Sequence, residues 1–339
     1  MAEKITSLDV AARAGVSRSA VSRVYTPGAS VSKSTAAKVR AAAGELGYRP
    51  NVLARSLNTG RSRIIGLVVA YLENQFYPEA IEKLSHALQA KGYHVLVFMA
   101  SNDSAATQQV IDELLDYQVD GIIAASVGLS NDLTSRCEEA GIPIVLFNRD
   151  QFDERLSSVT SDNKSGGRKL ADFLLAGEHK QIAHIAGWEG ASTQIDREAG
   201  FVAGLREAGA ELVARGVGNF HFETAKQAAR DMFDCDAPPD AVFVANDHMA
   251  FAVMDVLRFE LGISVPGDVS VVGYDDVNLA AWASYDLTTV RQRANVMVDQ
   301  AVNILMTRLD QVNTPARRVT IDGPLIMRGS ARKPKGSAT

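Results

Sequence analysis

Hydrophobic and polar positions follow two different patterns along the chain, which meet near residue 63. Beyond that point, short continuous runs of Val, Ile and Ala alternate with amphipathic stretches of helical period, such as 78–90 and 165–176. Continuous apolar runs between helices are typical of parallel strands that helices cover on both faces. The pattern predicts strands at 64–70, 94–100, 121–126, 143–148, 181–186, 241–245 and 269–273.

These units are too many for one sheet, so we predict two α/β lobes with parallel sheets, divided near residue 160. In an open α/β sheet, ligands bind outside the carboxyl ends of the strands. Several predicted strands end in aromatic or polar side chains, in the motifs AYLENQFY, FNRD, AGWEGAS, ANDHMA and GYDD. These strand ends are therefore the place to expect a small-molecule site.

Residues 6–25, TSLDVAARAGVSRSAVSRVY, have the pattern of two helices that cross at a tight turn. Ala11 is small enough for the helices to approach closely, Gly15 suits a turn with positive φ, and Val21 would anchor the second helix in the core. Ser17 stands where it would cap the amino terminus of that helix. The helix would then present Arg18, Ser19 and Arg23 outward.

Charge is distributed unevenly between the two patterns. Residues 1–63 contain 11 Lys and Arg against 3 Asp and Glu, a net charge of +8, whereas residues 64–339 contain 24 against 37, a net charge of −13. A basic head on an acidic body is expected when the head meets phosphate groups and the body does not. The alternative is a solvated basic face without a partner.

Length and composition limit the class of protein. A chain of 339 residues exceeds one ordinary core and predicts two or three domains. The hydrophobic content is 46%, with no apolar run near 18 residues, so we expect a soluble protein with no membrane contact. The first 15 residues lack the uninterrupted apolar stretch of a secretory signal, which favours a cytoplasmic location.

Motifs of enzymes and metal sites are missing from the sequence. It contains no GxSxG, no GxxxxGK(S/T) and no HExxH, and Cys137 and Cys235 lack metal-like spacing. The adjacent Asp275 and Asp276 would point in different directions at a strand end, which disfavours acid–base catalysis. We therefore expect no catalytic residues, no metal and no cofactor.

The head sequence LDVAARAGVSRSAVSRV, continued by VSKSTAAKVRAAAGELGYRPNVLARSLNTGR, closely resembles the lactose-repressor/purine-repressor family of bacterial transcription regulators. The body adds DGII, SDNKSGGRKLADFLL, IAHIAG, DREAGFVAGL, ANDHMAFAVM and VSVVGYDD, so the resemblance covers about residues 5–330. It implies an all-α helix-turn-helix domain at 1–49 and a hinge helix and linker at 50–62. A two-lobed, periplasmic-binding-protein-like core for effector binding and dimerisation would occupy 63–330, followed by a flexible tail at 331–339.

The resemblance implies that the second helix of the head enters the major groove of DNA. Arg18 and Ser19 occupy the two main specificity positions and Arg23 a third one. A guanidinium can bind guanine O6 and N7 with two hydrogen bonds, so we expect guanines in the half-site; the alternative for Arg18 is phosphate contact alone. Residues 25–28, YTPG, depart from the common turn of the family. The candidates for phosphate contact are Ser7, Ser17, Thr26 and Ser30.

The segment 51–58, between Pro50 and Gly60, is the predicted hinge. Eight residues do not sustain a helix alone in water, so its folding would be coupled to DNA and to a partner hinge. By resemblance, Leu57 is the leucine that enters a central base step from the minor groove; the alternative is packing on its own core. The hinge residues that we expect at the DNA are Asn51, Ala54 and Leu57.

The resemblance also implies which residues bind the effector. Arg197 matches the arginine that holds the ligand, although a salt bridge is the alternative role, and Asp275 has turn capping as its alternative. Asn246 precedes Asp247, which we predict as a helix N-cap, and Asn148 stands where an Asp is common. Aromatic and polar groups together suit a polyhydroxylated ligand. The full set is Phe76, Tyr77, Asn148, Thr193, Arg197, Phe222, Asn246 and Asp275.

The combined expectation is a cytoplasmic, ligand-responsive regulator, most simply a repressor. It would bind a pseudopalindromic DNA operator as a homodimer and respond to a small sugar or sugar derivative. One alternative is a corepressor-dependent regulator with a nucleobase ligand, against which Ala191 counts, because the purine-type pattern has an arginine there. Another is a periplasmic-type binding module without DNA function, against which the basic head counts.

Overall fold

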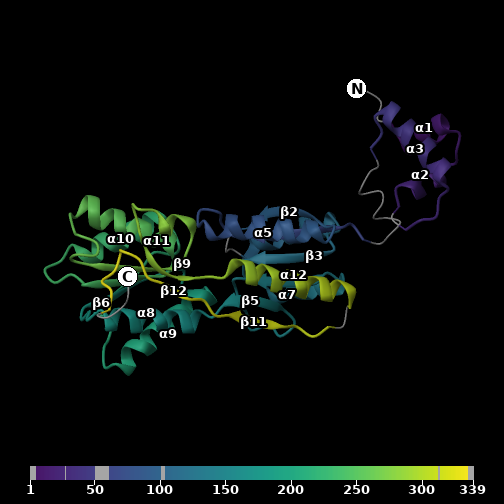
Figure 1. The fold of residues 1–339 in the computed structure, drawn as a ribbon. Coiled ribbons are helices and arrows are strands. Elements are labelled where there is room, and N and C mark those ends of the chain that lie inside the picture. The colour runs from purple at the N-terminus through teal and green to yellow at the C-terminus, as the bar shows by residue number, and fades with distance from the viewer. Residues whose placement is uncertain (1–4, 27, 50–60, 101–103, 312–313, 335–339) are drawn as a thin grey trace. The chain divides into compact units, whose positions relative to one another are not determined.

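The computed structural model describes residues 5–26, 28–49, 61–100, 104–311 and 314–334, and divides the chain into two compact units, Met1–Arg63 and Ile64–Thr339 (Figure 1). The predicted hinge residues Asn51, Ala54 and Leu57 lie outside the described residues. Among the helices that are described, none is long and apolar enough to cross a membrane.

The first unit is a three-helix head. Its helices are α1 (Ser7–Ala14), α2 (Arg18–Val24) and α3 (Lys33–Leu46). The side chains of Thr6, Ser17 and Ser32 cap the three amino termini, and Gly15 ends α1 with φ of +65°. The predicted turn and cap are confirmed. A small core fixes the helices, made of Val10, Ala11, Val21, Val39, Ala42 and Ala43.

The second unit contains two sheets. The first has the strand order β11-β5-β4-β3-β1-β2, and all its pairs are parallel. Its strands are β1 (Ile64–Val69), β2 (His94–Met99), β3 (Gly121–Ala125), β4 (Ile144–Phe147), β5 (Ser157–Ser161) and β11 (Arg318–Ile321). Helices α5 (Phe76–Ala90) and α12 (Ala294–Asp310) pack on one face, and α6 (Ser104–Asp116) and α7 (Asn131–Glu139) on the other.

The second sheet has the order β12-β10-β9-β8-β6-β7, with only the β10–β12 pair antiparallel among the described strands. Its strands are β6 (Ile182–Ala186), β7 (Ala214–Val217), β8 (Ala241–Val244), β9 (Ser270–Asp275), β10 (Thr288–Arg291) and β12 (Leu325–Ile326). Its helices are α8 (Asn163–Ala176), α9 (Ser192–Glu207), α10 (Phe222–Phe233) and α11 (Asp247–Asp255), with the short helices η1 (Val256–Glu260) and η2 (Asn278–Ala281).

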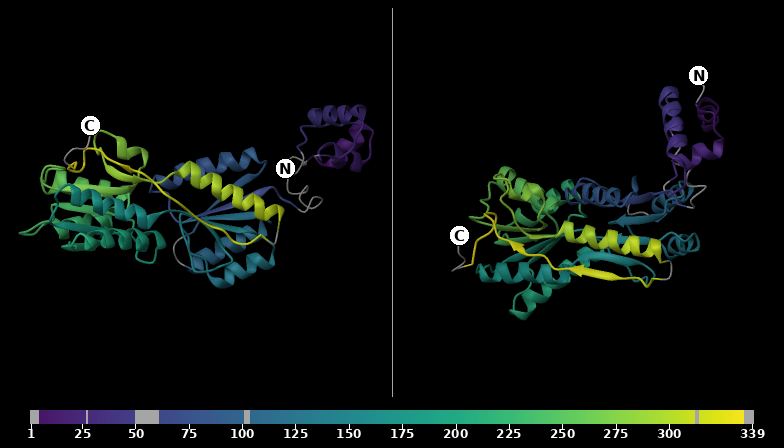
Figure 2. Two further views of the ribbon diagram at one scale, coloured as in Figure 1. Left: turned by 60° about the horizontal axis from the view of Figure 1, so that its bottom comes forward. Right: turned by 45° about the vertical axis from the view of Figure 1, so that its right-hand side comes forward.

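The chain crosses between the two lobes three times. The predicted division near residue 160 is the first crossing, between β5 and α8; the others join β10 to α12 and β11 to β12 (Figure 2). The prediction of a single division was therefore incomplete, because α12 and β11 return to the first lobe. Strand β11 pairs with β5 there and completes the sheet edge.

Two glycines allow α8 and α9 to pack almost backbone to backbone. A Cβ on Gly167 would lie 2.0 Å from the carbonyl oxygen of Arg197, and a Cβ on Gly200 would lie 2.0 Å from the carbonyl oxygen of Lys164. Neither contact can be relieved by a side-chain rotation, because the opposing atoms belong to the backbone. The position of Arg197 thus depends on this close helix pair.

The substitution Gly200→Ala should lower the free energy of unfolding of the core by about 2–3 kcal/mol, because α8 and α9 must separate to accept the methyl group. Urea denaturation followed by circular dichroism measures the change. Gly44→Ala in α3 is the control, since its added methyl meets nothing within 4 Å and alanine favours helix. A Gly200 variant as stable as wild type would contradict the close packing.

Candidate functional site

The exposed face of α2 carries the predicted DNA-reading residues. Arg18, Ser19 and Arg23 are all exposed, as predicted, and the hydroxyl of Ser17 accepts a hydrogen bond from the amide of Ala20 at 3.2 Å. The Arg18 Nε donates to the Ser7 Oγ at 3.2 Å, which links the start of α1 to the start of α2. The head therefore presents one guanidinium beside two hydroxyl groups, a set that can serve base edges or phosphates.

The other two hydroxyl groups predicted to contact phosphate, those of Ser30 and Thr26, differ in their hydrogen bonding within the head. Ser30 is exposed. The hydroxyl of Thr26 donates to the carbonyl oxygen of Ser22 at 2.8 Å, so its proton is used within the head and only its lone pairs remain for a partner. Arg13 belongs to the same unit but is not among the predicted DNA contacts. It forms an exposed ion pair with Glu45 at 2.6 Å.

The second candidate site lies where the strands of the two lobes end, and Arg197 is its most highly connected side chain. Only 2% of Arg197 is exposed. Its guanidinium donates to the carbonyl oxygen of Ala245 at 2.7 Å, to Asn163 Oδ1 at 2.9 Å and to Asp275 Oδ1 at 3.3 Å. The guanidinium carbon also lies 3.8 Å from the centre of the Tyr274 ring. The salt-bridge alternative considered for Arg197 is thus realised inside the predicted site.

Asp275 joins the two lobes. It accepts hydrogen bonds from Asn74 Nδ2 at 2.9 Å, which belongs to the first lobe, and from Gln292 Nε2 at 2.7 Å. Burial raises the pKa of Asp275, while Arg197 and these amides oppose that shift. Beside the crossover from β10 to α12, a cavity of about 420 Å³ has Phe76, Asp275 and Gln292 in its wall.

The capping prediction at the end of β8 was wrong by one residue. Asn246, not Asp247, caps α11, because Asn246 Oδ1 accepts from the amide of Met249 at 2.9 Å. Asp247 is the first helical residue and is fully buried. The Nδ2 of Asn246 is buried and has no hydrogen-bond partner among the described residues, so it can donate to a bound molecule.

Asn148 and Tyr77 form the polar part of the first lobe. Asn148 has φ of +55° at the end of β4, and its Nδ2 donates to the Tyr77 hydroxyl at 3.1 Å. Its Oδ1 is buried without a described partner. The ring of Phe76 stacks on Phe147 at 6.2 Å and is part of the core beneath Tyr77. Thr193 is buried in the first turn of α9.

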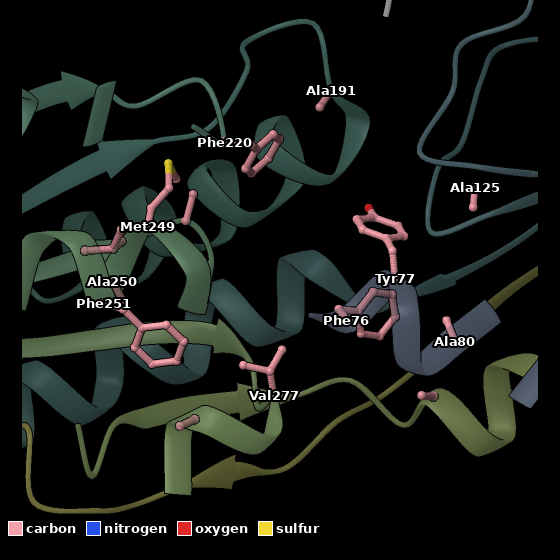
Figure 3. Packing of buried hydrophobic residues seen from close by; sticks show 14 of the residues in the cluster. Phe76, Tyr77, Ala80, Ala125, Ala191, Phe220, Met249, Ala250, Phe251 and Val277 are labelled. Carbon is pink, nitrogen blue, oxygen red and sulfur yellow. The ribbon is translucent and has the colours of Figure 1, made fainter. Parts of the chain in front are cut away.

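The aromatic contact between the lobes comes from Phe220. Figure 3 shows Phe220 and Tyr77 on facing sides of the space between the lobes, and the Phe220 ring lies 6.5 Å from Tyr71 at an interplanar angle of 22°. The predicted Phe222 is half-buried at the start of α10, 5.7 Å from the His248 ring. Sequence reasoning missed Phe220, which lies two residues before α10 and therefore gives no periodic signal.

Sequence reasoning also missed Arg149, Tyr71, Asn74 and Gln292. Arg149 directly follows Asn148 in FNRD, so the strand-end motif that drew attention to Asn148 was also the signal for Arg149. Asn74 lies in AYLENQFY, another strand-end motif. Nothing in the local pattern marks Gln292, which reaches the site because β10 ends beside β9.

A second carboxyl group is buried behind Asp275. Asp247 Oδ1 accepts from the Thr289 hydroxyl at 2.6 Å, and its Oδ2 accepts from the amide of Val277 at 3.0 Å. Burial, followed by the negative charge of Asp275, raises the pKa of Asp247 to about 8. Burial therefore favours the protonated form of Asp247, whereas the ion pair with Arg197 favours the charged form of Asp275.

The contribution of Asp247 to the stability of the core should fall as pH rises from about 4 to about 8. The native state keeps a proton on Asp247, whereas the unfolded chain releases it near the ordinary aspartate pKa of about 4. One proton sets an upper limit of about 1.4 kcal/mol per pH unit. Asp247→Asn should flatten this dependence in thermal unfolding measured between pH 4.5 and 8, and the exposed Asp299→Asn on α12 should leave it unchanged. An equal slope in both variants would contradict the assignment.

Known proteins resemble this chain in both units. Residues 6–51 match bacterial regulatory proteins of the lacI family, and residues 65–311 match a periplasmic binding protein domain. The ribose operon repressor of Escherichia coli (strain K12) is 30% identical over 96% of this chain and 99% of its own length. The HTH-type transcriptional regulator CelR of Thermobifida fusca is 33% identical over 95% of this chain and 96% of its own.

Solved structures give the same result. The lac repressor dimer bound to operator and an anti-inducer superposes with a TM-score of 0.86 at 27% identity, covering 97% of this chain and 99% of that chain. A complex of the transcriptional regulator CelR with cellobiose superposes with a TM-score of 0.73 at 31% identity, covering 97% of this chain and 100% of that chain.

Proposed function

The chain belongs to the lacI family of bacterial regulatory proteins and is a ligand-responsive transcriptional regulator, and from this premise we propose that it is a cytoplasmic repressor controlled by a sugar or sugar derivative. It binds a pseudopalindromic operator as a homodimer through its head and carries out no catalysis. The effector binds where the strand ends of the two lobes meet, around Arg197 and Asp275.

One observation supports a polyhydroxylated ligand most directly. Several buried polar atoms at the strand ends lack a partner among the described residues, and they include a donor, Asn246 Nδ2, and two acceptors, Asn148 Oδ1 and Gln292 Oε1. A hydroxyl group can donate and accept, so neighbouring hydroxyls of a sugar match such a mixed set. The faces of Tyr77 and Phe220 suit the apolar face of a sugar ring.

The contacts between the lobes offer a route from ligand to DNA. Besides the bond from Asn74 to Asp275, the amide of Asp150 donates to the Ser192 Oγ at 3.0 Å across the lobes. A ligand that bonds to Asp275 or Arg197 competes with these contacts and changes the relative free energy of two lobe arrangements. A ligand-dependent lobe arrangement would then change the affinity of a dimer for its operator.

Arg18→Ala should weaken binding to the preferred operator by about 1–3 kcal/mol and relax the preference at one base pair in each half-site, because a guanidinium reads a base edge. The operator is first selected from random DNA, and fluorescence anisotropy then compares single-base variants. Arg13→Ala is the matched control, since Arg13 is paired with Glu45, and it should keep the base preference. A loss for Arg18→Ala that is uniform across all variants would assign Arg18 to phosphate contact.

Asp275→Asn should still bind operator but lose its response to ligand, because Asp275 links the ligand site to the lobe contact with Asn74. The ligand is found by a thermal-shift screen of sugars, and operator affinity is measured with and without it. Lost response means constant repression for an inducible repressor and lost repression for a corepressor-dependent one.

Lys164→Ala is the control for Asp275→Asn, since the Lys164 side chain is 70% exposed and forms a surface ion pair with Asp196. It should keep the wild-type response. If Asp275→Asn also responds normally, the effector binds elsewhere.

A further inference from the structure

Arg149 is a buried cation at the strand ends that the mechanism above leaves without a role. Only 3% of Arg149 is exposed. One of its terminal nitrogens donates to the carbonyl oxygen and the hydroxyl of Ser126, at 2.8 and 3.1 Å, and both partners are neutral. The guanidinium carbon lies 5.4 Å from the ring centre of Trp188, which belongs to the other lobe.

No carboxylate of the described residues forms an ion pair with Arg149, whereas Arg197 is paired with Asp275. The Nε of Arg149 is buried and has no hydrogen-bond partner among those residues. Burial lowers the pKa of Arg149 and so does Arg197, while Tyr77 and Tyr71 oppose the shift. A buried guanidinium without a counter-ion is costly, and a bound anion would remove that cost.

The start of α9 lies next to Asp150, the residue after Arg149, and favours the same kind of partner. The hydrogen bond from the Asp150 amide to Ser192 places the first residue of α9 next to the residue that follows Arg149. The N-cap of α9 is Ala191, so no side chain caps the helix, and its first turn contains no acidic residue. The uncapped amides and the helix dipole attract negative charge at this end.

Within the described part of the chain, Arg149 lacks the kind of carboxylate partner that Arg197 has in Asp275. Arg197 and Asp275 compensate each other, and the residue directly before Arg149 is an uncharged amide, Asn148. The nearest acidic neighbour in sequence, Asp150, is directed to Arg318 at 3.5 Å and to the Ser158 hydroxyl at 3.0 Å. Arg149 therefore carries a positive charge that no ion pair among the described residues balances.

We propose that the effector is a carboxylated sugar, whose carboxylate binds Arg149 at the amino terminus of α9 while its hydroxyls meet Asn148, Asn246 and Asp275. This assignment rests on the effector site proposed above and narrows its ligand from sugars in general to sugar acids. A carboxylate carries a single negative charge, which balances the positive charge of Arg149. A phosphate ester carries a charge of about −1.5 to −2 at pH 7, which is more negative charge than Arg149 alone balances.

The test uses the full-length protein and pairs of probes that differ in one group. Thermal shift and isothermal titration calorimetry compare D-glucuronate with D-glucose, D-galacturonate with D-galactose, and D-gluconate with D-sorbitol, and D-glucose 6-phosphate serves as the phosphate arm. At least one acid should bind at least tenfold more tightly than its neutral counterpart. Its affinity should fall with added salt, because the contact is ionic.

Arg149→Gln should weaken binding of that acid roughly 10- to 100-fold, the size expected for a hydrogen bond to a charged group, and weaken binding of the neutral sugar by a much smaller factor. Arg149→Lys keeps the charge and should recover part of the affinity. Arg206→Gln is the control, since Arg206 is exposed in the last turn of the same helix α9, and it should bind like wild type.

The outcomes separate this proposal from the function on which it rests. A neutral sugar that binds as tightly as its acid, with Asp275→Asn abolishing both, would overturn the acid assignment and keep the effector site. Preference for the phosphate ester would overturn the carboxylate. An equal loss of acid and neutral sugar in Arg149→Gln would make Arg149 a structural residue. If no probe of either kind binds, both the acid assignment and the sugar site fail.

Discussion

The buried pair of Arg197 and Asp275 is the interaction on which the arrangement of the core depends. Two charges in a protein interior are stable only when further hydrogen bonds replace the lost water. Here the guanidinium donates to Asn163 and to the Ala245 carbonyl oxygen. The carboxylate accepts hydrogen bonds from Asn74 and Gln292. Because Asn74 comes from the other lobe, the same hydrogen bonds that solvate Asp275 also hold the lobes together. A ligand that replaces one of these partners must therefore act on the lobe arrangement.

The residues packed around Arg197 and Asp275 help to stabilise this buried ion pair. Glycines at 167 and 200 bring α8 within backbone contact of α9, so that Asn163 at the start of α8 reaches the Arg197 side chain. Behind the pair, burial favours the protonated form of Asp247, which limits the negative charge beside Asp275. Tyr274, stacked on the guanidinium, keeps water from its remaining face. The close packing of α8 on α9 and the protonation of Asp247 thus both stabilise the ion pair of Arg197 and Asp275.

The parts of the molecule that sequence predicted are those with a local cause. Strands such as β1 and β3 are continuous apolar runs, and Ser17 caps α2 by a contact within three residues. Strand β5, SSVTS, was missed because it is largely polar and is a strand only through its neighbours β4 and β11. Arg149 was missed for a related reason: its burial comes from Ser126 and Trp188, which are distant in sequence.

The position of Arg149 also bears on how an anion would act on the protein. The guanidinium belongs to the first lobe, whereas Trp188 and the start of α9 belong to the second. A carboxylate held between them would interact with both lobes at once, and only in the arrangement in which the Asp150 amide reaches Ser192. Its binding free energy would then depend on lobe arrangement, which is the condition for shifting a population. A neutral sugar, which lacks this ionic link, would have to obtain the same difference from hydroxyl contacts alone. Under this proposal, a negative charge on the ligand would therefore determine whether its binding changes the lobe arrangement.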